Sequence, residues 1–195
     1  MSAPDILIAG AGMIVHDQIL PSLYHLQRLG RLRSITVCAR RAESIQSLRD
    51  SPALSRAFPD QNFAATTEPF LQALRNLPSA QIAFIAVPDH LHYDFIMAAL
   101  AHNQHVCTVK PLVLEAHQSA RIAAEAQQRG LVVAIDYHKR FDDRSLMARR
   151  AYRDGRFGEF RLGTAHLLEK WNYRRSNFQN WMTSAHSDAF TYIGC

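Results

Sequence analysis

The fold is decided by residues 5–15, which read DILIAGAGMIV. This segment opens with a short, largely apolar run, and Gly10 and Gly12 follow it at once. A run of this kind that ends in glycines is typical of a buried strand entering a tight turn. A helical pattern of apolar residues then extends over residues 14–29, where a glycine ends it. Pro21, inside that pattern, predicts a kink or a break in the helix.

Strand-like and helix-like segments alternate from this point up to residue 135. We predict strands at residues 34–39, 81–87, 105–109 and 131–135, and helices at residues 41–51, 70–77, 90–101 and 115–129. Segments of these lengths in alternation are typical of βαβ units and a parallel sheet. Residues 82–87 are apolar throughout, as expected of a strand covered on both faces. The sequence therefore predicts a Rossmann-type α/β fold, a doubly wound parallel sheet.

The character of the chain changes near residue 155. Residues 154–158 are typical of a loop, and residues 159–171 have the partly alternating pattern of a longer strand. We predict a first domain at residues 1–136 and, at residues 137–195, a connecting helix followed by the beginning of an α+β second domain. Because no further helix–strand pair follows, we expect that the second domain is incomplete and that the chain is truncated.

The composition is that of a globular protein with a modest excess of positive charge. Of the 195 residues, 48% are apolar, and 22 Lys plus Arg against 17 Asp plus Glu give a net charge of +5. The cations are spread along the chain in local pairs, whereas nucleic-acid-binding proteins concentrate them on one face. This favours a small anion such as a nucleotide over nucleic acid as partner.

The positions of the cysteines and histidines indicate the cellular compartment and whether a metal site is to be expected. The three cysteines, Cys38, Cys107 and Cys195, are far apart and form no Cys-x-x-Cys pair, which favours a reducing compartment. The histidines between residues 90 and 105 have no acid or thiol at ligand spacing, so no metal site is predicted. No signal peptide and no membrane span is evident, so we expect a cytoplasmic protein without a membrane partner.

The glycine turn has the context of a dinucleotide site. Glycines between a strand and a helix let the backbone approach a pyrophosphate, whose charge lies at the helix N-terminus. The third position of the motif is Val15 rather than glycine or alanine, so a plain strand-to-helix turn is the alternative interpretation.

Two arginines bear on the choice of cofactor. Arg40 and Arg41 follow strand 34–39, where a protein that binds NAD commonly carries an acidic residue for the ribose hydroxyls. Guanidinium groups bind phosphate through planar, charge-assisted hydrogen bonds. The pair therefore predicts NADP as the cofactor, with NAD as the alternative. A solvated start of the next helix is the other interpretation of the pair.

Four segments together carry a family resemblance: GAGMI at 10–14, VPDHLH at 87–92, HVCTVKP at 105–111 and DYHKRF at 136–141. In this order and spacing they resemble the Gfo/Idh/MocA family of NAD(P)-dependent oxidoreductases, which act on sugars, inositols and related polyols. The resemblance covers essentially the whole chain. It implies the same Rossmann-type domain, followed by a second domain that mediates oligomer contacts, so we expect a homo-oligomer for the full-length form.

The resemblance also implies roles for matching positions. Those that would line the pyrophosphate are Gly10, Gly12, Met13 and Ile14. Those that would lie near the ribose and nicotinamide half are Pro88, Asp89 and His92. Lys110 matches the lysine of a Glu-Lys-Pro motif that touches both the nicotinamide ribose and the substrate hydroxyl, so it is the candidate catalytic residue; a solvated surface amine is the alternative.

Candidate substrate-binding residues come from the later segments. His138 and Arg140 lie in the segment that leads toward the substrate site in the family. Trp181 could stack on a sugar ring, although aromatic residues at a domain junction more often pack against one another.

The sequence departs from the family pattern at the catalytic positions. Val109 stands where the glutamate before the lysine is expected, and Tyr192 aligns with the acid of an Asp-x-x-x-His element. The histidine of that element would come directly after Cys195. Tyr192 could supply a substitute catalytic hydroxyl, or it could be a core residue.

These observations lead to one main expectation and one alternative. We expect an NAD(P)-dependent oxidoreductase that transfers a hydride to or from a C–OH/C=O centre of a sugar or cyclic polyol. The missing acids at positions 109 and 192 give weight to the alternative, a nucleotide-binding sensor or regulator without turnover.

Overall fold

The computed structural model describes residues 3–164, 166, 168, 182–183, 186–187 and 191–192. Its centre is one six-stranded sheet in the order β3-β2-β1-β4-β5-β6, and every neighbouring pair is parallel. The strands are β1 (Ile6–Ala9), β2 (Ile35–Cys38), β3 (Ala64–Thr66), β4 (Ile82–Ile85), β5 (His105–Val109) and β6 (Val133–Asp136). This is the strand order of a dinucleotide-binding Rossmann fold, so the predicted fold class is confirmed.

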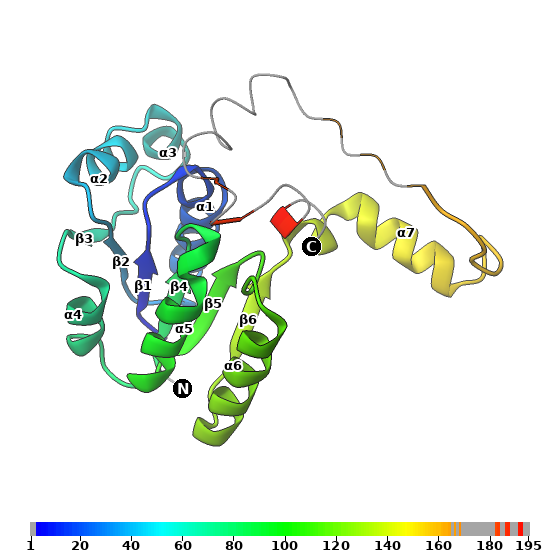
Figure 1. Ribbon diagram of the computed structural model, residues 1–195. Helices are drawn as coiled ribbons and strands as arrows, with labels where there is room; N and C mark the ends of the chain where they lie inside the picture. The colour runs from blue at the N-terminus through cyan, green and yellow to red at the C-terminus, as the bar shows by residue number, and fades with distance from the viewer. Residues whose placement is uncertain are drawn as a thin grey trace.

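Helices cover both faces of the sheet (Figure 1). The α-helices are α1 (Leu20–Arg28), α2 (Ala42–Arg49), α3 (Pro52–Ala57), α4 (Phe70–Arg75), α5 (His92–Ala101), α6 (Ala116–Arg129) and α7 (Asp143–Arg153). Shorter helical turns are η1 (Val15–Ile19), η2 (Asp89–Leu91) and η3 (His138–Phe141). No helix in the described part of the chain is both long and apolar enough to cross a membrane.

The alternation of side chains along β1 explains why the core has two halves. Ile6 and Ile8 belong to one buried cluster, with residues of α1, α2 and α3. Leu7 and Ala9 belong to the other, with residues of α4, α5 and α6. Successive strand residues point to opposite faces of a sheet, so an unbroken apolar strand requires apolar cover on both sides.

The helix after the glycine turn changes its hydrogen-bond pattern next to Pro21. Residues 15–19 form a π-helix, in which the Leu20 N–H donates to the Val15 carbonyl five residues back. The α-helix α1 then begins with Pro21 in its first turn, where a missing N–H costs no hydrogen bond. The change from π- to α-helical hydrogen bonding therefore lies just before the proline, and the helix continues through it without a break.

Two short elements, α3 and β3, were not predicted. Helix α3 begins at Pro52, where the Ser51 side chain accepts a hydrogen bond from the Leu54 N–H, so the helix predicted at residues 41–51 ends earlier, at Arg49. Strand β3 has three residues at the edge of the sheet and none of them is fully buried. An exposed edge strand needs no apolar run, so its sequence carries no clear signal.

The strand predicted at residues 159–171 is wrong for its first six residues. Residues 159–164 are exposed and form no strand. A strand is stabilised by backbone hydrogen bonds to a neighbour, and within the described residues every strand belongs to the six-stranded sheet. Most of the remaining residues of this prediction lie outside the described ones, and the division into two domains stays a prediction.

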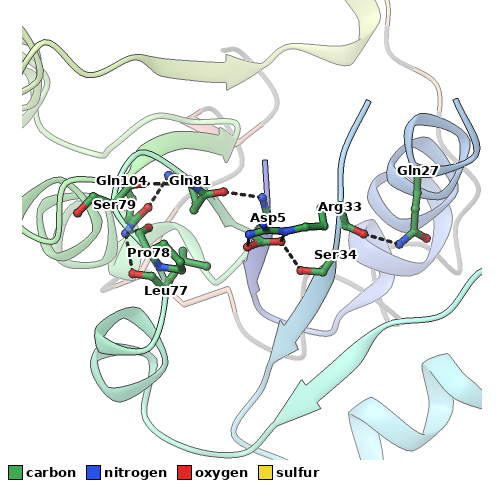
Figure 2. A network of polar contacts seen from close by, with 9 residues as sticks. All are labelled: Asp5, Gln27, Arg33, Ser34, Leu77, Pro78, Ser79, Gln81 and Gln104. Carbon is green, nitrogen blue, oxygen red and sulfur yellow. Dashed lines mark hydrogen bonds and ion pairs between the residues drawn. The ribbon is translucent and has the colours of Figure 1, made fainter. Parts of the chain in front are cut away.

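A network of polar side chains fixes the amino-terminal edge of the sheet (Figure 2). The Asp5 carboxylate accepts hydrogen bonds from Arg33 Nε at 2.8 Å and Ser34 Oγ at 2.6 Å, which ties β1 to β2. The Asp5 N–H donates to Gln81 Oε1 at 2.7 Å, and the Gln81 N–H donates to buried Gln104 at 2.9 Å. These bonds hold β2, β1, β4 and β5 in register, so their opposite ends also align.

Candidate active site

The residues predicted for the cofactor site meet at the carboxyl edge of the sheet. Ala9 at the end of β1 is the register partner of Cys38 on β2 and of Ile85 on β4. Sequence order along the sheet reverses between β1 and β4, and ligands of open α/β sheets bind in the crevice at such a point. The turn at Gly10 and the segment that begins with Pro88 leave the sheet there.

The two glycines of the turn differ in the space around them. Gly10 has φ +114°, and a Cβ there would lie 2.2 Å from the Ala86 carbonyl oxygen, so this position requires glycine. Around Gly12, by contrast, a Cβ would meet nothing within 4 Å. Helical structure begins at Met13 and Ile14, and the first N–H groups of a helix have no partner within it. The open space at Gly12, followed by N–H groups at the start of a helix, suits the binding of a pyrophosphate.

Arg40 and Arg41 follow β2, the strand next to β1. Both side chains are exposed, and Arg41 is the residue before the first turn of α2. In the described part of the chain neither guanidinium forms an ion pair. Both guanidinium groups thus lie exposed at the edge where the glycine turn leaves the sheet.

Asp89, in the turn after β4, is a buried carboxyl group. It is 4% exposed and accepts a hydrogen bond from Ser187 Oγ at 2.6 Å. Burial raises the pKa of Asp89, and the Ser187 hydrogen bond and the nearby charges of His92 and Lys110 only partly oppose that effect. Val109 replaces the expected glutamate, but η2 supplies a carboxyl group that interacts electrostatically with the candidate catalytic lysine.

His92 is fully buried and holds two segments together. Its Nδ1 lies 2.7 Å from the Pro111 carbonyl oxygen and its Nε2 lies 2.9 Å from that of Val87. Both ring nitrogens are therefore engaged with backbone, which links the end of β4 to the residue after Lys110. The geometry gives His92 a positioning role, and its predicted contact with a cofactor stays a prediction.

The two candidate catalytic residues, Lys110 and Tyr192, are in direct contact. Lys110 follows β5 and is half-buried, and its Nζ lies 3.3 Å from the centroid of the Tyr192 ring. The same Nζ donates a hydrogen bond to the Tyr192 carbonyl oxygen. Lys110 is therefore not a solvated surface amine, and Tyr192 covers it from the C-terminal side.

Sequence reasoning missed two further contacts of the C-terminal segment. The rings of His90 and His186 stack with centroids 4.0 Å apart and an interplanar angle of 17°. Burial, and then the charge of His186, lowers the pKa of His90. Ser187, which binds Asp89, was not singled out either. The alignment that placed Tyr192 at a catalytic position could have pointed to both residues a few positions earlier.

The predicted substrate residues His138 and Arg140 lie on η3, directly after β6. Arg140 places its guanidinium carbon 5.3 Å from the centroid of the Tyr137 ring. A concavity of about 530 Å³ is lined by Lys139, Arg140, Ser145 and Arg149, three of which the sequence did not single out. Trp181 lies outside the described residues.

The two described cysteines are poor nucleophiles, because their thiols are held in the protonated form. Burial raises the pKa of Cys38, and it raises that of Cys107 to about 12. In the described ranges no group of three or more histidine, cysteine, aspartate or glutamate residues is arranged to hold a metal ion.

Comparison with curated proteins finds dehydrogenases among the relatives of this chain. Over 165 residues the chain is 25% identical to the D-glucoside 3-dehydrogenase of Escherichia coli, which covers 85% of this chain and 43% of that protein. The chain thus spans less than half the length of the curated relatives it matches.

Solved structures share the fold. The 3-ketoreductase KijD10 of Actinomadura kijaniata, in complex with NADP and TDP-benzene, matches with a TM-score of 0.61 and 19% identity over 78% of this chain and 42% of its own. The WlbA dehydrogenase of Bordetella pertussis, in complex with NADH and UDP-GlcNAcA, matches with a TM-score of 0.61 and 19% identity over 79% and 43%.

Residues 5–137, which contain the glycine turn, the whole sheet and Lys110, match the Gfo/Idh/MocA oxidoreductase family with its NAD-binding Rossmann fold. The match spans more than half of the chain and confirms the resemblance in the sequence motifs. The chain belongs to the Gfo/Idh/MocA family of oxidoreductases.

Proposed function

We propose that the chain supplies the cofactor site and the catalytic lysine of an oxidoreductase that prefers NADP and acts on a sugar, a cyclic polyol or a related compound. One observation carries the proposal. The Gly10 turn and Lys110 lie at the carboxyl ends of β1 and β5, on either side of β4, at the point where strand order reverses. A dinucleotide that crosses this edge would have its pyrophosphate at the turn and its nicotinamide toward Lys110.

The residues present fit such a cofactor. The position of the Ala86 carbonyl leaves no space for a side chain at Gly10, and the open space at Gly12 admits a phosphate next to the first turn of the helix. When bound, the nicotinamide would accept or supply the hydride.

Lys110 would handle the proton that accompanies the hydride. Oxidation of an alcohol also releases the hydroxyl proton, which an uncharged Nζ accepts, and reduction of the carbonyl requires the reverse transfer. Asp89 provides an acidic neighbour, and His92 positions the segment that carries Lys110 by binding the Pro111 carbonyl. Tyr192 would orient Nζ through its ring and its carbonyl oxygen.

The preference for NADP rests on Arg40 and Arg41. Both are exposed beside the turn, and a 2′-phosphate would give their guanidinium groups a doubly charged partner. Replacing both by serine should lower the ratio of NADPH to NADH affinity about tenfold, measured as two dissociation constants. The matched control is Arg75→Ser, an exposed arginine at the end of α4. A wild-type chain that binds NADH more tightly than NADPH would overturn this assignment.

Turnover can be followed as the change in NADPH absorbance with a panel of sugars and inositols and their keto forms. We expect activity with at least one of them, and Lys110→Ala should reduce it about 10²- to 10⁴-fold while NADPH binding persists. Activity that survives this substitution would remove Lys110 from the reaction.

A sensor without turnover is the second candidate, and the contact between Lys110 and Tyr192 supports it. The aromatic ring lies on the amine that a substrate would have to reach. If this candidate is right, the chain binds NADPH and shows no turnover with any member of the panel, and Tyr192→Ala does not restore it.

A further inference from the structure

Lysines and arginines occur throughout the chain, but their excess over acidic residues is largest in one short stretch. Residues 139–156 contain seven lysines and arginines and three aspartates, a net charge of +4 out of +5 for the whole chain. These residues form most of η3, all of α7 and the turn that follows. Figure 1 shows α7 projecting from the sheet beyond β6.

The cations in this stretch have no acidic partner within the described structure. None of the ion pairs between described residues includes a side chain from residues 139–156. Of the nearby acids, Asp142 caps α7 by accepting hydrogen bonds from the Arg144 and Ser145 N–H groups. Within the described residues, no ion pair compensates this positive charge.

Part of this charge lines a hollow. Lys139 and Arg140 on η3 and Ser145 and Arg149 on α7 surround the concavity of about 530 Å³. Ser145 and Arg149 are four residues apart and therefore share one face of the helix. The lining offers two guanidinium groups, an ammonium and a hydroxyl, and it contains no carboxylate. Such a set of donors matches the oxygens of a phosphate or a diphosphate.

Helix η3, which lines part of the hollow, begins near the candidate active site. Val109 and Asp136 are register partners on neighbouring parallel strands, so Lys110 and Tyr137 leave the same edge side by side, about 4.8 Å apart by the usual strand spacing. Helix η3 follows Tyr137 at once, and the guanidinium of Arg140 lies over the Tyr137 ring. A substrate with its reacting hydroxyl at Lys110 could therefore extend a charged group toward the hollow.

We propose that the hollow between η3 and α7 is a phosphate-binding subsite, and that the substrate at Lys110 carries a phosphate or diphosphate group. The second part rests on the oxidoreductase function proposed above. The four lining residues are exposed and form one shallow concave cluster rather than a stripe, so a phosphorylated small molecule fits better than nucleic acid.

Calorimetric titration of the 195-residue chain with inorganic pyrophosphate tests the subsite, in 0.15 M salt and with NADPH present in excess to fill the glycine turn. We expect one binding event that Arg149→Gln weakens about fivefold. Arg144→Gln, on another face of the same helix and outside the lining, should leave it unchanged. UDP and glucose 6-phosphate distinguish a nucleoside diphosphate from a sugar phosphate as the source of the phosphate, and tighter binding than glucose by either one supports the proposal.

Two results would overturn the subsite: no pyrophosphate binding, or binding that both variants weaken equally. Tighter, Arg144-dependent binding of a single-stranded oligonucleotide would also overturn it, in favour of nucleic acid. The two proposals fail separately. NADPH binding without pyrophosphate binding refutes only the subsite. Pyrophosphate binding that depends on Arg149, in a chain that does not bind NADPH, refutes the oxidoreductase function and the link to Lys110.

Discussion

The ammonium of Lys110 lies over the ring of Tyr192, with Nζ 3.3 Å from the ring centroid, and donates to the carbonyl oxygen of the same residue. The contact joins residues 82 positions apart and places part of the C-terminal segment on the edge of the Rossmann sheet. It involves the ring face and the main chain of Tyr192, which distinguishes two possible roles for this residue.

Tyr192→Phe and Tyr192→Ala separate these roles. Phenylalanine retains the ring and the carbonyl, so we expect kcat close to that of the wild type. Alanine removes the ring and should lower kcat by about 2- to 30-fold, since cation–π contacts contribute about 0.5–2 kcal/mol. Steady-state kinetics on the substrate that gives turnover measures both. A large loss with phenylalanine would instead make the hydroxyl the catalytic group.

Gly10→Ala should lower the free energy of unfolding, whereas Gly12→Ala should leave it nearly unchanged. At Gly10 the new Cβ would lie 2.2 Å from the backbone oxygen of Ala86 at a positive φ, and we expect a loss of about 2–3 kcal/mol in the free energy of unfolding. At Gly12 the space is open, and the change should stay within about 0.5 kcal/mol. Urea denaturation measures both, and equal losses would refute the close approach at Gly10.

The stacked pair His90 and His186 makes stability depend on pH. Because burial and the neighbouring histidine charges lower the pKa of His90, the folded state binds a proton there more weakly than the unfolded state. The contribution of His90 to stability is complete above pH 6.5 and is lost as the pH falls through its folded pKa. We expect the melting temperature to fall between pH 7 and pH 5 in the wild type and less steeply in His90→Gln. Equal slopes would contradict the lowered pKa.

Asp89 should make stability depend on pH in the opposite direction from His90. Its pKa is raised, so its ionisation opposes folding as the pH rises from about 3.8 through the folded pKa. Asp89→Asn removes that cost and retains an oxygen that accepts from Ser187, so its free energy of unfolding at pH 7 should equal or exceed that of the wild type. Ser187→Ala leaves the buried carboxyl without its partner and should be destabilising by about 1–2 kcal/mol. Destabilisation by Asp89→Asn at pH 7 would contradict the account.

The central strands of the sheet could be predicted because each is an apolar run in the local sequence. The apolar run before Gly10 and the run at residues 82–87 need two covered faces, and both are central strands. Strand β3 gave no such signal, because its three residues lie at the edge and are partly exposed. The partly alternating pattern at residues 159–164 wrongly predicted a strand, because alternation alone does not provide a neighbouring strand to pair with.

The site was only partly predictable for a different reason. The family resemblance located the glycine turn, Lys110 and Tyr192, but no local pattern shows that Ser187 binds a carboxyl group 98 positions earlier or that His186 stacks on His90. Likewise, the hollow at Lys139 and Arg149 forms only where η3 and α7 lie next to each other. Contacts of this kind depend on tertiary structure, which periodicity does not reveal.

The central claim is that the turn at Gly10 and Gly12 holds the diphosphate of a nicotinamide dinucleotide. Calorimetric titration of the chain with NADPH, in the wild type and in Gly12→Val, tests it most directly, because the open space at Gly12 accepts valine without disturbing the fold. We expect one molecule of NADPH per chain, with the binding lost in the variant while its melting temperature is unchanged. Absence of binding to the wild type, or equal affinity in the variant, would contradict the account.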